Sequence, residues 1–142
     1  MKISRGFTLI ELLVVIAIMV ILMGTVLVAL NPGRQYKMAR DAKRESDINA
    51  ILNAINQYQV DNNGNPPEEI TMETCPLTSI IGLDNLDLSP SLVASYIALI
   101  PTDPDTSCDE INSCYEICQT QANRITVLAP LTETRDKLSV TR

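Results

Sequence analysis

A single carboxylate stands inside a long apolar run near the start of the chain. Glu11 is the one charged residue among the 24 residues from Phe7 to Leu30. In a bilayer, an acid costs about 2.5–3.5 kcal/mol on insertion scales, and the acids found there tend to have a function. A plain membrane anchor gives no reason for Glu11, so we expect this carboxylate to take part in an interaction.

Four cysteines offer the second kind of chemistry, either disulfides or a metal site. They are Cys75, Cys108, Cys114 and Cys118. Their gaps differ from the paired two-residue gaps of common zinc sites, and the chain has no histidine, which favours disulfides over zinc. Three connectivities exist. If Cys114 and Cys118 shared a strand, their Cα atoms would be roughly 13 Å apart, beyond the ~7 Å limit of a bridge. We expect Cys108–Cys114 with Cys75–Cys118.

An acidic stretch is the third group. Asp103, Asp105 and Asp109 supply carboxylates at alternating positions, and Glu110 follows them. Oxygen ligands in such a pattern suit Ca²⁺, whereas the alternative is a solvated acidic turn. Calcium at these three aspartates is the one cofactor that the sequence suggests.

Catalytic groups are otherwise missing. Without histidine, the Ser–His and Cys–His arrangements and the commonest general base are absent. The five glycines are scattered, so the sequence contains no glycine-rich phosphate loop. The sequence therefore predicts that the protein is not an enzyme.

The element that positions Glu11 is predicted to be a helix over residues 7–30. At roughly 1.5 Å per residue this helix is about 36 Å long, enough to cross a bilayer core of about 30 Å. Lys2 and Arg5 precede it and favour a cytoplasmic N-terminus, with the chain from Asn31 onward outside. A secretory signal is a poor alternative, because the apolar region is too long and ends without a small-residue cleavage site.

A second, amphipathic helix is predicted within residues 31–62. Asn31-Pro32-Gly33 predicts a break before it, and Asp61–Pro67 is rich in turn residues that end it. Its apolar stripe recurs at helical spacing and consists of Ile48, Ile51, Ile55 and Tyr58. The basic face from Arg34 to Arg44 is expected either to pair with acidic surfaces of adjacent subunits or to be solvated.

Residues 63–142 are predicted to form a globular head with a variable loop. Pro90 to about Ile97 reads as a short helix. Cys114–Cys118 and Arg124–Leu131 read as a β-hairpin, with a third strand near Ser139–Val140 or before Cys114. The tail, residues 132–142, is polar and is expected to be ragged. The fold class is therefore α+β, with a long N-terminal helix packed on a small antiparallel sheet.

Charge is distributed unevenly along the chain. The formal net charge is −6, and without Lys2 and Arg5 it is −8. Residues 61–142 hold four basic and 13 acidic residues, whereas residues 31–60 hold five basic and three acidic ones. A head of this charge argues against binding nucleic acid through its bulk surface.

The N-terminus resembles that of bacterial type IV pilins and pseudopilins. The resemblance rests on the short basic leader, residues 1–6, on Gly6 followed by Phe7, and on Glu11 in an apolar segment. It implies that a prepilin peptidase cuts between Gly6 and Phe7 and methylates the new amine of Phe7. It also implies that Glu11 offsets the positive N-terminus of a neighbouring subunit. Major pseudopilins of type II secretion carry a calcium loop in a place similar to that of Asp103.

The resemblance implies a structural subunit that polymerises through its N-terminal helix. Such a subunit is expected in the inner membrane before assembly and in an extracellular filament at the cell surface afterwards. Its partners would be copies of itself or other pilins, the peptidase, and an inner-membrane assembly platform. The alternatives are a pseudopilin of type II secretion or DNA uptake, and a monomeric membrane-tethered binding domain.

Overall fold

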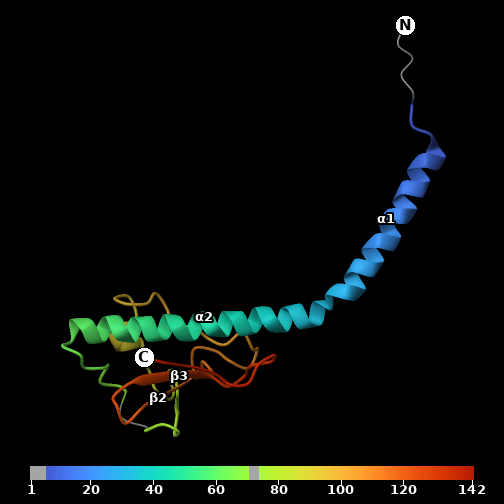
Figure 1. Ribbon diagram of the computed structural model, residues 1–142. Coiled ribbons are helices and arrows are strands. Elements are labelled where there is room, and N and C mark those ends of the chain that lie inside the picture. The colour runs from blue at the N-terminus through green and yellow to red at the C-terminus, as the bar shows by residue number, and fades with distance from the viewer. Residues whose placement is uncertain (1–5, 71–73) are drawn as a thin grey trace. The chain divides into compact units, whose positions relative to one another are not determined.

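The computed structural model describes residues 6–70 and 74–142 (Figure 1). The chain divides into an N-terminal unit, Met1–Tyr36, and a second unit, Lys37–Arg142. Of the predicted leader, Gly6 belongs to the described residues, and Lys2 and Arg5 lie outside them.

Helix α1, Leu9–Leu30, dominates the first unit. It begins at a regular cap, because the Oγ1 atom of Thr8 accepts a hydrogen bond from the amide of Glu11 at 3.3 Å. It has 22 residues, and an 18-residue stretch within it has a mean hydropathy of 3.1, so the helix is long and apolar enough to cross a membrane. None of its residues is buried in this chain. A helix that is apolar on all sides needs lipid or other helices around it.

The predicted break after this helix is present. Asn31 has a left-handed backbone (φ 42°) and ends α1, and α2, Pro32–Asp61, begins at the next residue. The amide of Arg34 donates to the backbone oxygen of Asn31 at 3.0 Å and to its side-chain oxygen at 3.4 Å. Pro32 has no amide hydrogen to satisfy and fits the first position of a helix. Asn31 and Pro32 thus end one helix and start the next.

In the second unit, α2 supplies one layer of the core. Its buried apolar residues are Ile48, Ile51, Leu52, Ala54 and Ile55. They form one cluster with Tyr115 and with residues of the sheet, including Ile117, Ile125 and Val127. The spacing of the buried isoleucines matches the helical repeat, which explains why this stripe faces the sheet.

The sheet has four antiparallel strands in the order β1-β2-β3-β4. The strands are β1 Ser79–Ile80, β2 Glu116–Gln119, β3 Ile125–Ala129 and β4 Leu138–Thr141. Figure 1 shows α2 running along this sheet. The long helix and small antiparallel sheet confirm the predicted α+β class.

Three predicted elements differ in detail. The short helix α3 covers Ser89–Leu92 and stops well before Ile97, because Ala94 has a positive φ of 70°. Strand β2 begins at Glu116, since Cys114 also has a positive φ (60°) and is not extended. The expectation of a ragged tail is wrong for residues 138–141, where the strand expected near Ser139–Val140 is present as β4. Leu138–Thr141 pairs with β3 over its whole length, and its Val140 packs against the core.

Candidate functional site

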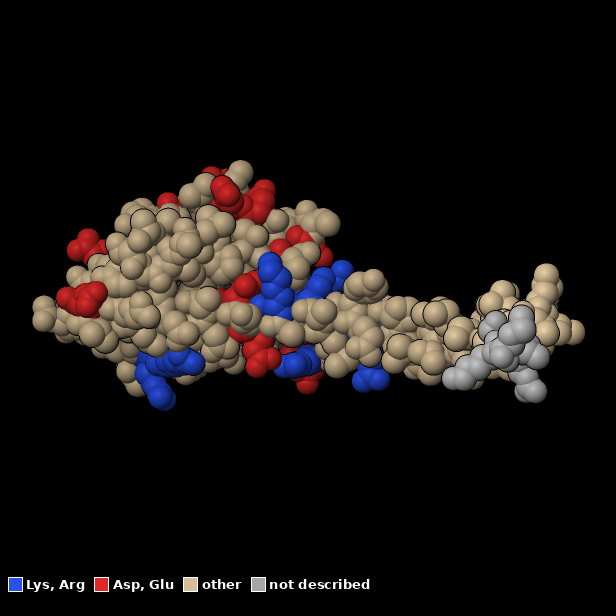
Figure 2. All heavy atoms as spheres, turned by 90° about the horizontal axis from the view of Figure 1, so that it is seen from above, with Lys and Arg blue, Asp and Glu red and all other residues tan. Residues whose placement is uncertain are grey.

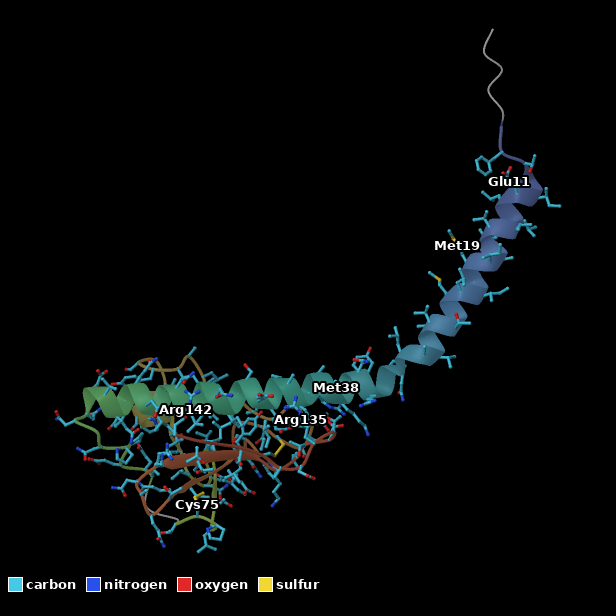
Figure 3. The ribbon with its side chains drawn as sticks, viewed as in Figure 1. Glu11, Met19, Met38, Cys75, Arg135 and Arg142 are labelled. Carbon is cyan, nitrogen blue, oxygen red and sulfur yellow. A yellow bond between two sulfur atoms is a disulfide. The ribbon has the colours of Figure 1, made fainter. Side chains whose placement is uncertain are left out.

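The residues of the predicted processing and assembly site lie at the start of α1. Phe7 has 79% of its surface exposed, and Gly6 before it is also exposed. Glu11 lies in the first turn of α1, where a carboxylate is favoured by the helix dipole (Figure 3). Within the described residues, no basic side chain forms an ion pair with it. The arrangement presents a carboxylate on an otherwise apolar rod.

A second arrangement of charges lies in the head and is centred on Arg44, which is 1% exposed. Its Nε and Nη2 atoms donate to the two carboxylate oxygens of Asp103 at 2.7 and 2.9 Å. Its Nη1 atom donates to Asp41 at 2.8 Å and to Glu133 at 3.3 Å. We call these four residues the Arg44 cluster. They tie α2 to two segments that are about 60 and 90 residues away in sequence.

Asp41 is the most completely bonded member of this cluster. Besides Arg44, it accepts hydrogen bonds from the amides of Glu133 and Thr134 at 3.0 and 2.8 Å and from the Thr134 hydroxyl at 2.6 Å. Burial alone would raise the pKa of this carboxyl, but these hydrogen bonds outweigh burial and hold the pKa well below its usual value. The hydrogen bonds to Asp103 raise the pKa of Arg44 in turn. Both groups are therefore charged at neutral pH.

Two of these residues differ from the roles that the sequence predicts. The sequence places Arg44 on a basic face that is solvated or paired with adjacent subunits, yet Arg44 is buried within its own head. The sequence also suggests Asp103 as a calcium ligand. The i, i+3 spacing of Asp41 and Arg44 was the only local signal of an ion pair. No local signal links Arg44 to Asp103, because the two residues meet only when the chain is folded.

The structure does not bring the predicted calcium ligands together. Asp103 is buried, and both of its oxygens bind Arg44. Asp105 accepts hydrogen bonds from Ser107, and Asp109 caps the amides of Ile111 and Asn112. In residues 6–70 and 74–142, no three acidic, Cys or His side chains are grouped as a metal ion requires. Calcium binding stays a prediction, to which the described residues offer no preformed site.

All four cysteines are in disulfides, which join Cys75 to Cys118 and Cys108 to Cys114. The first bond ties the loop before β1 to β2, and the amide of Cys75 also donates to the backbone oxygen of Gln119 at 3.0 Å. The second closes the acidic loop just before β2. These are the two pairs expected from the sequence.

Comparison with known proteins agrees with the N-terminal geometry. Residues 1–27 match the prokaryotic N-terminal methylation motif. The chain is 33% identical over 109 residues to the type II secretion system core protein G of Escherichia coli (strain K12). That alignment covers 71% of this chain and 66% of the relative, just under two thirds of its length. No solved structure matches the chain. Together with the apolar α1 that carries Glu11 and the α+β head, these matches support the type IV pilin and pseudopilin family as the group that this chain resembles.

Proposed function

We propose that this chain is a structural subunit of a type IV pilus-like filament and that it polymerises through α1. The observation that carries the proposal is the contrast between the two units. The head buries its own core, whereas all 22 residues of α1 are exposed, and Glu11 is the one charged residue among them. Lipid shields the apolar side chains of α1 from water before assembly, and neighbouring α1 helices shield them in a filament. This role is structural and requires no catalytic group.

Processing fits the same segment. A prepilin peptidase would cut the bond between Gly6 and Phe7, and Phe7 is exposed in the structure. Cleavage creates a positive amine at Phe7, four residues before Glu11. Among apolar helices, where the effective dielectric constant is low, an amine and a carboxylate from adjacent subunits attract each other strongly. Glu11 would thus set the axial register between neighbours as well as neutralise the new charge.

Localisation follows from this cycle. The subunit is held in the inner membrane by α1 with its N-terminus in the cytoplasm. An assembly platform in that membrane then moves it into the extracellular filament. Partners are copies of this chain or other pilins. The bulk surface of the acidic head has no role in binding nucleic acid.

The test is the Glu11→Ala variant, compared with Glu68→Ala, which removes an exposed glutamate of the head. Filaments are sheared from the native host, and their subunits are weighed by intact mass spectrometry. The wild type and Glu68→Ala should yield subunits that begin at methylated Phe7. Glu11→Ala should be cut but largely absent from filaments. Wild-type filament yield from Glu11→Ala would refute its role, and an uncut wild-type chain confined to the membrane would leave only a tethered binding domain.

A type II secretion pseudopilus is the second candidate, because the relative from Escherichia coli bears the name of that system. The two roles predict different effects of deleting the gene. A pilus subunit is required for fibres on the cell surface. A pseudopilin is required for the release of secreted proteins, which would otherwise accumulate inside the cell.

A further inference from the structure

The first turns of α2 carry a basic face that has no partner among the described residues. Arg34, Lys37 and Met38 are separated by three and four positions, so they lie on one side of the helix, and all three are exposed. Farther along α2, Arg40 and Lys43 are already paired with Glu133 and Asp47. Arg34 and Lys37 form no such ion pair in the described chain. We call Arg34, Lys37 and Met38 the basic face.

The head carries a surface with the opposite properties. A cavity of about 60 Å³ is lined largely by apolar side chains, among them Leu83, Leu88, Leu99 and Ile100. Leu83 and Leu99, which line the cavity, are 52% and 61% exposed, so their side chains also face solvent. The acidic residues that line this cavity are Asp87 and Glu110, and Asp84 and Asp109 are the sequence neighbours of the lining residues Leu83 and Glu110. We call the cavity and these four residues the acidic hollow.

Tertiary contacts hold the acidic hollow together, because two chain segments are fixed against each other there. The amide of Leu83 donates to the backbone oxygen of Glu110 at 3.2 Å. Gly82 lies so close to Ile111 that an added Cβ would come within 2.1 Å of its backbone oxygen. The disulfide Cys108–Cys114 closes the second segment. The backbone segments that carry Leu83 and Glu110 are therefore fixed against each other at this cavity.

Charged side chains lie in several groups on the surface. Figure 2 shows Asp and Glu side chains in groups on the head, and Lys and Arg side chains both on the head and along α2, where some Asp and Glu side chains lie among them. None of the four carboxylates of the acidic hollow is in an ion pair within the described chain. Like charges that lie near one another repel each other, and a basic partner would relieve that repulsion.

We propose that the acidic hollow of one subunit binds the basic face of another copy of this chain. Arg34 and Lys37 would pair with the carboxylates, and the flexible thioether of Met38 would pack against Leu83 and Leu99. The two surfaces differ, so the contact is heterologous and can repeat from one subunit to the next, which generates an open helical fibre when the rotation between subunits does not close into a ring. This inference rests on the proposed filament and names a second contact in it, separate from α1 and Glu11.

The first test reverses charges on both surfaces. Lys37→Glu and Glu110→Lys should each lower the yield of sheared filaments about tenfold, because each places like charges opposite one another. The double variant Lys37→Glu with Glu110→Lys should restore most of the yield. Arg124→Glu, which reverses an exposed arginine in the β2–β3 turn, is the matched control and should leave the yield unchanged. Failure of the double variant to recover, or an equal loss in Arg124→Glu, would overturn the contact.

The second test locates the contact directly. A benzophenone amino acid replaces Met38 in the full chain, filaments are irradiated, and cross-linked peptides are identified by mass spectrometry. Cross-links to residues 83–87, 99 or 109–111 of another copy are expected. Filaments that form normally but cross-link elsewhere would overturn this contact and leave the proposed function intact. If the wild-type chain forms no filament at all, the proposed function fails and this contact fails with it.

Discussion

At the scale of single residues, the head depends on one buried cation. Arg44 faces two carboxylates that are themselves almost fully buried, and every buried side-chain polar atom in the described residues has a hydrogen-bond partner. Taking charges out of water is expensive, so such a cluster is stabilising only while it is complete. Its value to the fold is that it fixes the segments at Asp103 and Glu133 against α2.

We predict that Arg44→Met destabilises the head severely. The change keeps an apolar chain of similar reach but leaves Asp41 and Asp103 buried without their cation, at a cost of about 3–5 kcal/mol. Urea unfolding followed by circular dichroism measures this loss. The control is Arg135→Met, which breaks an ion pair with Glu45 in which both side chains are about half exposed. That control should cost about 0–1 kcal/mol, and an equal loss in both variants would contradict a special role for Arg44.

What the sequence reveals at this scale depends on whether the signal is local. Glu11 stands out because its neighbours along the chain are all apolar, so its unusual position can be read directly. The apolar repeat of α2 is equally local. Two of the three partners of Arg44, Asp103 and Glu133, are distant in sequence, and Asp41 accepts hydrogen bonds from the backbone amides of Glu133 and Thr134. Such contacts cannot be predicted from the types and spacing of neighbouring residues in the sequence.

At the scale of elements, two disulfides compensate for a sheet with short strands. Strand β1 has two residues, and β2 and β4 have four each. Small domains with little core need such links. The bond Cys75–Cys118 spans 43 residues, whereas Cys108–Cys114 spans six.

We predict that the two disulfides differ in their contribution to stability. In the chain-entropy treatment, a loop of 43 residues corresponds to about 4 kcal/mol and one of six to about 2 kcal/mol. Both disulfides are removed in turn, by the double variant Cys75→Ser with Cys118→Ser and by the double variant Cys108→Ser with Cys114→Ser. The first double variant should lower the free energy of unfolding more than the second. Urea unfolding of each, compared with the wild type, provides the measurement. A larger loss from opening the six-residue loop would contradict the loop-length argument.

Helices and the central strand were predictable because their patterns are strong. Strand β3 is rich in β-branched residues, and the break at Pro32 follows from proline itself. For strand β4 the sequence predicts a third strand near Ser139–Val140 or before Cys114, while the polar residues of the tail suggest an irregular chain. The formation of β4 is decided by pairing with β3 and by the contact of Val140 with the core, and both are tertiary effects.

At the scale of the whole molecule, the two units differ in whether they bury their apolar side chains within the chain. The buried apolar core lies within the second unit and includes Ile48, Tyr115 and Val127. The first unit contributes no buried residue of its own among those described. The head can thus be complete before assembly, while α1 remains the part that changes its surroundings from lipid to other helices.

We therefore predict that a chain beginning at Lys37 folds by itself and stays monomeric. It keeps the Arg44 cluster, both disulfides and the whole core, so its cooperative unfolding transition should match that of the head in the full chain. It lacks α1 and Arg34, so it should not form filaments. Analytical ultracentrifugation and thermal unfolding by circular dichroism test the two halves of this prediction. Non-cooperative unfolding of the shortened chain would mean that α1 or the first turn of α2 supports the head. Self-association into fibres would mean that the contacts between heads suffice to build the polymer.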